Sequence, residues 1–329
     1  MADDSDTAPL RPAELDGRWI RPAADIRAEP RWGHADGMQV GIPPIPGPRG
    51  LLRIFTPYLG HARDRLVNFI AIEPIPRGRT ERGYSELEPS RLDPGRRGKR
   101  LWTAEDPADR TPRSAVPPAR GTVDEDDGVE RLTVWVLVEP FDNGAEVRVR
   151  VRFRADRPHE VEVAGFAAPG SVPLAHLVLT ATMGNWARLR RLELADRVVS
   201  PAELWPGFDG TGFAPHARFG LHRLARDGRA AVLVATNDEE DPWSAVHADG
   251  TAEHWRFQGK RHRQIWRADD PHPELEAVVN ARWAYWASSS EIPGGPAFEN
   301  VELVEPFRQG AAFRFGVEPL DGPADPYCE

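Results

Sequence analysis

The sequence of 329 residues has a single cysteine, Cys328, next to its last residue. One cysteine excludes a disulfide framework and a cysteine-based zinc site, and this position argues against a buried cysteine nucleophile. No apolar run reaches the roughly 18 residues that a membrane-spanning helix needs. Residues 1–15 are acidic and lack the basic start and apolar stretch of a secretion signal. These absences predict a cytoplasmic protein without a membrane partner.

Lysine is nearly absent. It occurs only at Lys99 and Lys260, so all but two of the 42 basic residues are arginine. The arginines are scattered among 51 acidic residues, and the formal net charge is −9. Nucleic-acid binding needs a concentrated basic surface, so we expect no nucleic-acid partner. A local group of arginines can still bind a small anion, because the planar guanidinium matches carboxylate and phosphate groups.

Several catalytic fingerprints are also missing. The sequence has no GxSxG, GxxxxGK[ST] or HExxH, and no GxGxxG after a strand. These absences argue against lipase-type acyl transfer, P-loop phosphoryl transfer, zincin proteolysis and dinucleotide redox chemistry. The acidic run Asp124–Gly128 lacks the spacing of a calcium loop. We predict no cofactor and no metal. A cupin-like metal enzyme stays open only if three or more His or carboxylate ligands meet on inward strand faces.

The sequence is rich in period-2 alternation. From Ala145 to Arg154, apolar residues alternate with charged ones, which is typical of a strand with one buried face. Leu132–Val138 and Glu160–Val163 flank this segment across short turns and complete a three-stranded meander. Helical spacing is confined to short stretches near 12–17 and 200–205. Further strands are predicted at 38–42, 50–56, 66–73, 99–104, 174–182, 187–194, 217–224, 230–236, 252–258, 262–267, 276–286, 298–304 and 312–318.

The predicted fold is therefore all-β: a large antiparallel two-sheet β-sandwich, of jelly-roll or supersandwich type, with few short helices. A propeller would need an internal repeat of about 40–50 residues, and none is visible. We interpret 1–329 as a single domain. Within it, 1–104 supplies N-terminal strands or a lid, 105–128 is a long surface connection rich in proline and charge, and 129–319 forms the core sandwich.

Two N-terminal loops carry candidate site residues. Trp32, His34 and Asp36 lie close together just before a predicted strand. A loop of this kind can offer an indole to the face of a sugar and polar groups to its hydroxyls, so we predict substrate binding here. The alternative is a turn in which Trp32 anchors the core. His61, which follows another strand, is a candidate catalytic base.

A third group lies between residues 82 and 102. In an extended segment Tyr84, Glu86 and Glu88 share one face, because side chains repeat every two residues. Paired carboxylates beside a phenol suit acid and base chemistry on sugars, so we predict catalytic roles for all three. The alternative is a solvated face on which cations merely neutralise the glutamates. Substrate binding is predicted for the neighbouring residues Arg82, Lys99 and Trp102.

The remaining candidates lie in the C-terminal half. Asn185 and Trp186 form a corner between two strands, where an amide and an indole can hold a sugar ring. His254 and Trp283 are further predicted binding residues. Glu299 follows a Pro-Gly-Gly loop that lets a ligand approach the backbone, and we predict that it is catalytic. For both tryptophans, a place in the core is the alternative.

The stretch Glu139–Phe166 (EPFDNGAEVRVRVRFRADRPHEVEVAGF), with the order of the strands and their tryptophans and arginines, resembles the sandwich domains of galactose-mutarotase-like carbohydrate-active proteins. The resemblance is one of architecture over about half the chain, and it includes no catalytic motif. It implies a concave sheet that handles a sugar, and it assigns no site residue.

The first hypothesis is a carbohydrate-active enzyme, a glycoside hydrolase acting on oligosaccharides with paired carboxylates as acid and base. Glu299 would work with Glu86 or Glu88. A first alternative is a lyase for uronate-containing sugars, in which His61 or Tyr84 takes a proton and Arg82, Lys99 or Asn185 stabilises the developing enolate.

A second alternative is a non-catalytic carbohydrate-binding sandwich. It predicts aromatic residues on a shallow face and no convergent pair of ionisable groups. All three hypotheses share a carbohydrate ligand and leave the oligomeric state open.

Overall fold

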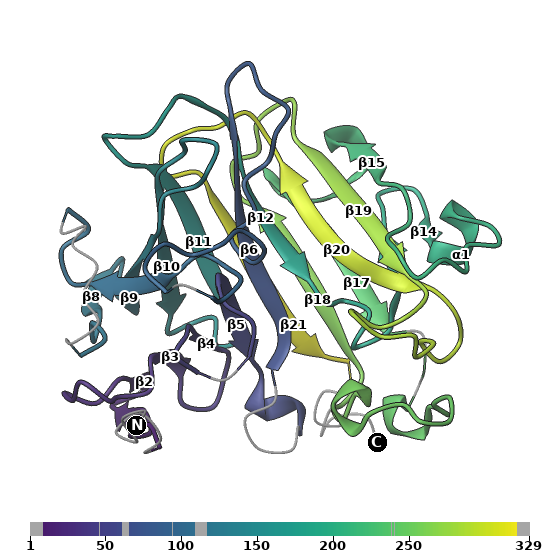
Figure 1. Cartoon of the computed structure of the whole chain (residues 1–329), viewed down its shortest axis with the longest axis horizontal. Helices are drawn as coiled ribbons and strands as arrows, with labels where there is room; N and C mark the ends of the chain where they lie inside the picture. Colours follow the sequence, from purple (N-terminus) through teal and green to yellow (C-terminus); the bar gives the residue numbers. More distant parts are fainter. Residues whose placement is uncertain are drawn as a thin grey trace.

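Two antiparallel β-sheets packed face to face make up the computed structural model of the chain (Figure 1). The structure describes residues 9–45, 47–60, 66–93, 95–108, 117–237, 239 and 241–320. This arrangement confirms the predicted all-β, two-sheet sandwich. None of the helices in these ranges is long and apolar enough to span a bilayer.

The first sheet has ten strands, and every neighbouring pair runs antiparallel. Their order across the sheet is β1 (Glu14–Asp16), β2 (Trp19–Arg21), β3 (Arg31–His34), β4 (Gln39–Gly41), β5 (Leu51–Phe55), β6 (Leu66–Pro76), β12 (Leu174–Thr182), β20 (Ala297–Val304), β19 (Glu276–Arg282) and β15 (Ala217–Gly220).

The second sheet has eleven strands. Nine form a continuous ladder: β14 (Val198–Val199), β13 (Leu189–Glu193), β17 (Ala230–Asn237), β18 (His262–Ala268), β21 (Ala312–Pro319), β11 (Glu160–Ala167), β10 (Val147–Arg154), β9 (Val129–Val138) and β7 (Leu101–Ala104). The others are β16 (Ala225–Asp227), which pairs with β17, and β8 (Thr122–Asp126), which pairs with β9. Short helices connect strands: α1 (Pro201–Leu204), η2 (Pro57–Leu59), η3 (Leu221–Arg223), η4 (Pro242–Ser244) and η5 (Glu253–Trp255).

The core lies between the two sheets and follows the alternation in the sequence. Along β10 the valines and Phe153 are buried, while the four arginines between them are only partly buried. Arg150 and Arg152 on that outer side pair with Glu162 of the neighbouring strand at 3.1 and 3.3 Å. The predicted meander of 132–138, 145–154 and 160–163 is thus present as β9, β10 and β11.

The stretch near 12–17 is a strand and not the short helix that its spacing suggested. Glu14–Asp16 pairs with β2 across a tight turn, and Gly17 takes a φ of 65° there. Only glycine adopts that backbone region at little cost, so the turn fixes the hairpin. The second predicted helix, near 200–205, is present as α1, which begins with a capping box between Ser200 and Glu203.

The end of the predicted surface connection 105–128 also forms a strand. Its acidic residues lie in β8, which pairs with β9 across a turn at Asp127 and Gly128, both with positive φ. Arg131 of β9 binds the carboxylates of Asp124 and Asp126 at 2.5 and 2.6 Å. The acidic run therefore borders a hairpin, where one arginine offsets its charge.

Strands from both halves of the chain meet in the ten-stranded sheet, because β6 pairs with β12 along most of its length. The side of this sheet that faces away from the core is called the outer face below. Part of it is buried as well: Leu51, Phe69 and Ala71 form a small apolar cluster there, with Met183 packed against it. Loops therefore cover the outer face at its centre, and polar residues lie beneath them.

Candidate functional site

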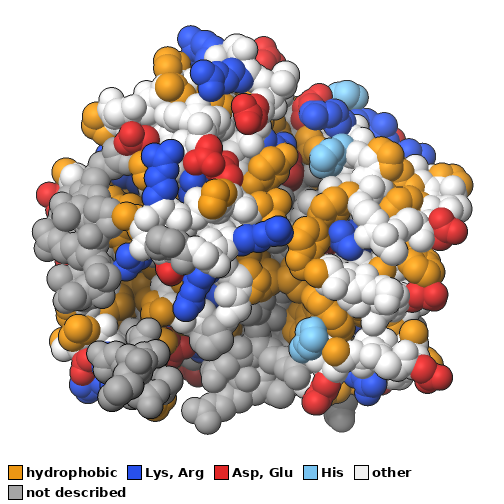
Figure 2. Space-filling view, viewed as in Figure 1, with side chains coloured by type: hydrophobic (Ala, Val, Ile, Leu, Met, Phe, Trp, Pro, Cys, Tyr) orange, Lys and Arg blue, Asp and Glu red, His pale blue; other side chains and the backbone are white. Residues whose placement is uncertain are grey.

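The centre of the outer face carries buried polar side chains from three adjacent strands. Glu302 of β20 stands between Val301 and Leu303, which both pack in the core, so its side chain points outward. By the same alternation Thr180 of β12 and Glu73 of β6 point outward too. Figure 2 shows a hollow in the middle of the molecule, over β12 and β20, lined by hydrophobic side chains with basic ones at its rim.

Arg82 bridges two of these carboxylates. Its Nη1 donates to Glu73 Oε2 at 2.5 Å and to Glu302 Oε1 at 2.8 Å, and its Nη2 donates to Glu302 Oε2 at 3.2 Å. The hydroxyl of Thr180 also donates to Glu302. Burial, together with the charges of neighbouring glutamates, raises the pKa of Glu73 well above its ordinary value. These four residues are called the Arg82 cluster below. Within the cluster, Arg82 offsets the charge of the two glutamates.

Glu86 lies beside the Arg82 cluster and is less completely bonded. Its Oε2 is buried and has no hydrogen-bond partner among the described residues. Burial raises its pKa to about 7, and the charges of Glu302 and Glu88 add to this while Arg82 opposes it. Tyr84, on the same loop, is exposed, and burial of part of its ring raises its pKa. The structure thus brings three predicted residues, Arg82, Tyr84 and Glu86, to one place.

The loop that carries them is a turn, which corrects the expected extended segment. The backbone N–H groups of Leu87 and Glu88 donate to the carbonyl of Tyr84, and the Glu88 carboxylate accepts from the Tyr84 N–H at 3.0 Å. Because the chain turns here, the strand-like sharing of one face by Tyr84, Glu86 and Glu88 does not apply. Glu88 instead points to Lys99, whose Nζ lies 3.1 Å away.

Glu88 and Lys99 tie the loop to the second sheet. The fully buried Lys99 also binds Asp142, at 3.1 Å, and the carbonyl of Pro89, at 3.2 Å. Glu88 accepts the backbone N–H of Asp142. The nearby Trp102 on β7 is buried. These contacts give Glu88 and Lys99 internal partners that hold the loop in place.

A β-bulge in β20 brings a second glutamate to the outer face. The register pairs Val279 with Val301 but Ala281 with Phe298, so two residues of β20 stand opposite the single residue between them on β19. Phe298 and Val301 both pack in the core, and Glu299 therefore points to the outer face, as Glu302 does. Two glutamates on one strand face the same side, about 10 Å apart along the chain.

Glu299 and Asn185 form an incompletely bonded pair. The backbone N–H of Asn185 donates to the Glu299 carboxylate. Among the described residues, neither Glu299 Oε2 nor either polar atom of the Asn185 side chain has a hydrogen-bond partner, although both residues are almost fully buried. Burial raises the pKa of Glu299 to about 7, opposed by the charge of Arg282. Buried polar atoms without partners are costly, and this pair therefore suits a ligand that supplies them.

The turn that presents Asn185 adopts an unusual backbone. Met183 and Arg188 have φ values of 73° and 53°, a region that residues other than glycine seldom occupy. Ala287, on the neighbouring loop after β19, has a φ of 50°. Backbone strain of this kind concentrates at binding and catalytic sites. Three of the four non-glycine residues with positive φ in the described ranges thus lie on segments beside the pair.

Two partly exposed aromatic rings pack against Arg282, the side chain whose charge acts on Glu299. The guanidinium carbon of Arg282 sits 4.9 Å from the ring centroid of Phe213 and 5.2 Å from that of Trp286. The two ring centroids are 5.9 Å apart, and the residues are 45% and 41% exposed. We call Phe213 and Trp286 the aromatic pair. Sequence reasoning did not select Phe213, Trp286 or Arg282 as site residues, because their proximity depends on how the loops at 211–213 and 284–286 meet.

Several predicted binding residues lie elsewhere. Trp32 is 1% exposed, with its Nε1 donating to the carbonyl of Ala119 at 3.0 Å, so its ring packs in the core. His34 is also buried, which lowers its pKa to about 4. Both lie on β3, five strand steps from β20, which corresponds to about 24 Å across the sheet. Asp36 follows them on the surface.

The other predicted residues divide between core and surface. Trp186 is buried in the core, and its Nε1 donates to the carbonyl of His254 at 3.1 Å. His254 itself is exposed, and Trp283 is partly buried. His61 lies outside the described residues. The predicted set therefore gathers in two places on the outer face, the Arg82 cluster with Glu86 and the Glu299–Asn185 pair, and the remainder is dispersed.

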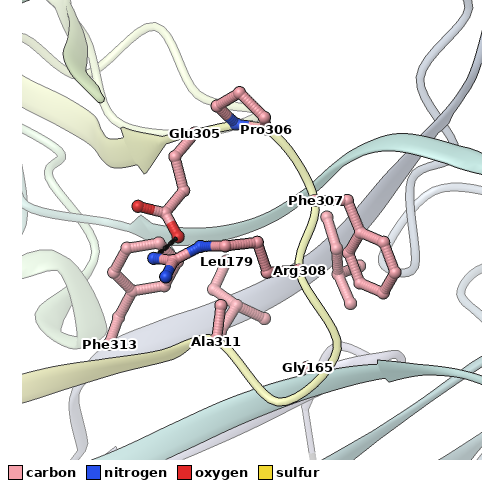
Figure 3. A pocket seen from close by; sticks show the side chains of 9 residues that line it. Gly165, Leu179, Glu305, Pro306, Phe307, Arg308, Ala311 and Phe313 are labelled. Carbon is pink, nitrogen blue, oxygen red and sulfur yellow. Dashed lines mark hydrogen bonds and ion pairs between the residues drawn. The ribbon is translucent and has the colours of Figure 1, made fainter. Parts of the chain in front are cut away.

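A small cavity elsewhere is too tight for a sugar. It has a volume of about 10 Å³ and lies beside Leu179, Phe307 and Phe313, with Arg308 crossing it toward Glu305 (Figure 3). That volume holds about one water molecule. In the part of the chain that the structure describes, no group of three His, Cys, Asp or Glu residues is placed to hold a metal ion.

Comparison with known proteins assigns no family to this chain. No family model matches it, and no curated protein matches it. A solved structure titled "Crystal Structure Analysis of HI1317" aligns with 93% of this chain and 97% of its own, at 8% identity and a TM-score of 0.25. A likeness at that level carries no argument about fold or function. The candidate site on the outer face of the ten-stranded sheet therefore rests on the geometry of this chain alone.

Proposed function

We propose that the protein is a glycoside hydrolase that acts on oligosaccharides at the outer face of the ten-stranded sheet. The observation that carries the proposal is Glu299: a buried carboxyl whose pKa is raised to about 7, with one oxygen and the neighbouring Asn185 amide unbonded among the described residues. A carboxyl that is still protonated near neutral pH can donate a proton to a glycosidic oxygen. Asn185, whose donor and acceptor have no partner within the described part of the chain, suits a sugar hydroxyl.

Glu86 is the proposed second carboxyl group. Glycoside hydrolysis uses one carboxylic acid and one carboxylate on either side of the bond that breaks. Glu302 and Glu88 have internal partners, Arg82 and Lys99, whereas one oxygen of Glu86 has no partner in the ranges that the structure describes. The charge of Glu302, which faces outward, acts on Glu86, and this supports a role for Glu86 near the outer face. In its ionised form Glu86 would act as base or nucleophile.

The aromatic pair supports a sugar rather than a smaller substrate. Phe213 and Trp286 are partly exposed and lie against Arg282, which is the side chain whose charge acts on Glu299. Sugar rings stack on exposed aromatic faces through their C–H groups, and the polar edge then points to nearby carboxyl and amide groups. In the predicted cytoplasmic location, imported oligosaccharides would be the available substrates.

The internal ion pairs disfavour the lyase alternative. Of the groups predicted to stabilise the enolate in an elimination, two are cations and the third is the amide of Asn185. Arg82 is bonded to Glu73 and Glu302, and Lys99 to Glu88 and Asp142, so both cations are already paired. The raised pKa of Tyr84 also makes its phenolate harder to form. These contacts are the reason to prefer hydrolysis.

A non-catalytic carbohydrate-binding sandwich is the second candidate. The exposure of Phe213 and Trp286 favours it, because shallow aromatic platforms are enough for binding. The two candidates differ in one requirement: hydrolysis needs Glu299 and Glu86 to reach the same glycosidic bond, and binding does not.

Amide substitutions separate the candidates. Turnover of neutral and uronic oligosaccharides would be measured through new reducing ends and unsaturated products, for the wild type and for Glu299→Gln, Glu86→Gln and Glu88→Gln. We expect Glu299→Gln and Glu86→Gln each to lower turnover by about 10²–10⁴-fold with the fold intact. Glu88→Gln, a matched control in the same loop, should lose turnover only as far as it loses stability.

Three outcomes are informative. Reducing ends that vanish in the Glu299 and Glu86 variants support hydrolysis. Sugar binding without turnover in the wild type supports the binding candidate. Unchanged turnover in both Glu299→Gln and Glu86→Gln would end the hydrolase proposal.

A further inference from the structure

An exposed histidine lies beside Asn280 on the outer face. β15 pairs with β19 so that Ala217 stands opposite Val279, and continuing this register places His216 beside Asn280. Because Ala217 and Val279 pack on the core, the residues next to them point to the outer face. Asn280 is also the residue of β19 that stands opposite the bulge at Glu299. His216, Asn280 and Glu299 therefore form a row across three neighbouring strands.

Hydrogen bonds fix the orientation of the Asn280 amide. The backbone N–H of Asn300 donates to Asn280 Oδ1 at 3.1 Å. The other polar atom of the amide is therefore the nitrogen, and this Nδ2 lies 3.3 Å from Nε2 of His216. A flipped amide would set its own N–H groups against the N–H of Asn300, at a place that is only 2% exposed.

The amide in turn determines which ring nitrogen of His216 carries the proton. Asn280 Nδ2 is a donor, so Nε2 of His216 accepts and the neutral ring carries its proton on Nδ1. Within the described ranges, Asn280 is the only hydrogen-bond partner recorded for His216. His216 is exposed, and its Nδ1–H is therefore available to a ligand on the outer face. Asn280 is thus a positioning residue for a fixed donor.

The row extends the site from Glu299 toward the edge of the sheet. Neighbouring strands are about 4.8 Å apart, so β15 and β20, with β19 between them, are separated by about 10 Å. Arg282, which packs against the aromatic pair, is two residues after Asn280 and lies on the same face of β19. Phe213 of that pair precedes His216 by three residues. A ligand that contacts Glu299, the aromatic pair and His216 therefore has to be longer than one sugar ring.

We propose that His216 binds the sugar unit next to the one that contacts Glu299, by donating from Nδ1 to an oxygen of that unit, and that Asn280 holds the ring in this donor form. The inference rests on the proposed function and adds a second subsite to it. The substrate would then be an oligosaccharide with at least two sugar units on the outer face. A neutral sugar suits this donor, because an imidazole with one proton carries no charge.

Nitrogen NMR of the imidazole rings tests the position of the proton. In ¹⁵N-labelled protein at pH 8, we expect the His216 ring, assigned by its absence from His216→Gln, to carry its proton on Nδ1. Asn280→Asp keeps an acceptor for the N–H of Asn300 but replaces the donor that faces Nε2 with a second acceptor. A proton should then move onto Nε2. A wild-type ring that carries its proton on Nε2 would overturn the inference.

Titration calorimetry tests the contact with the sugar. The probes are cellobiose, maltose and lactose, with glucose as the single sugar, and a Glu299→Gln background prevents turnover during the titration. We expect at least one disaccharide to bind more tightly than glucose. His216→Ala should lower that affinity about fivefold or more and change the binding of glucose little. His222→Ala is the matched control and should change neither, because His222 is an exposed histidine with no hydrogen bond recorded among the described residues.

The outcomes separate this inference from the hydrolase proposal. Unchanged disaccharide affinity in His216→Ala, while the wild type cleaves oligosaccharides, would overturn the inference alone. A loss of affinity in His216→Ala for a sugar that the wild type binds without cleaving it would support the contact and leave only the binding candidate. Binding of none of the disaccharides would count against both proposals. The NMR of the wild type keeps the test valid even if Asn280→Asp does not fold.

Discussion

Two buried glutamates of strand β20 lie three residues apart and have opposite surroundings. Glu302 receives two nitrogens of Arg82 and the hydroxyl of Thr180. Glu299 receives one backbone N–H, from Asn185, and keeps an oxygen unbonded among the described residues. Both are 2% exposed and both face away from the core. Burial alone therefore does not mark a functional carboxyl; the missing partners distinguish a group that holds the fold from one that is available to a ligand.

The largest effect on stability is expected at the Arg82 cluster, where Glu302 has its hydrogen-bond partners. Arg82→Met would leave Glu73 and Glu302 buried without their common cation, and we expect it to lower the free energy of unfolding by about 3–5 kcal/mol near pH 7. Urea denaturation measures this loss. Arg91→Met is the control, since Arg91 is an exposed arginine of the same region. A loss below about 1 kcal/mol would mean that the Arg82 cluster is not a structural unit.

Glu299 should behave in the opposite way. Its pKa is raised from 4.5 to about 7 in the folded protein, so between these pH values the folded state binds more protons than the unfolded state. Stability from this group is therefore present below about pH 4.5 and is lost as the pH rises to about 7, by at most about 3 kcal/mol. Glu299→Gln removes the titration, and its stability should fall less over this range than that of the wild type.

Thermal or urea denaturation between pH 4.5 and 8 checks this difference in slope. Glu73 and Glu86 also have raised pKa values and contribute in the same direction in both proteins, so the comparison isolates Glu299. If the two curves are parallel, Glu299 titrates near its ordinary pKa and loses its proposed role as the acid.

The β-sandwich could be predicted because the alternation of apolar and charged residues can be read within each strand. In β10 every second residue is apolar, and the side-chain period of a strand then fixes which face is buried. Arg82, Tyr84 and Glu86 could also be predicted as a group, since they lie within one loop. The partner carboxylate Glu302 is 220 residues from Arg82 in the chain, and no local pattern links them.

The second site depends on features that the sequence does not show. The bulge at Glu299 turns its side chain to the same face as Glu302, whereas a regular strand would place residues three apart on opposite faces. Trp32 and Trp186 were predicted to bind sugar, but an indole fits a core as well as a platform, and both pack in the core. The sequence contains eleven tryptophans, which suits a sugar-binding protein. It does not show which of them are exposed.

The smallest expected effect is on sugar affinity, and it tests whether Trp286 binds the sugar or is only an exposed ring. Trp286→Ala removes half of the aromatic pair beside Arg282, and we expect sugar affinity to fall about fivefold, which corresponds to about 1 kcal/mol. Trp243→Ala is the control, because Trp243 is 54% exposed on a different loop and no ring contact is recorded for it within the described residues. Both variants should lose little stability, since the two side chains are 41% and 54% exposed. Equal losses of affinity in both would indicate nonspecific contact, and no loss in Trp286→Ala would remove the aromatic pair from the site while leaving Glu299 and Asn185 in it.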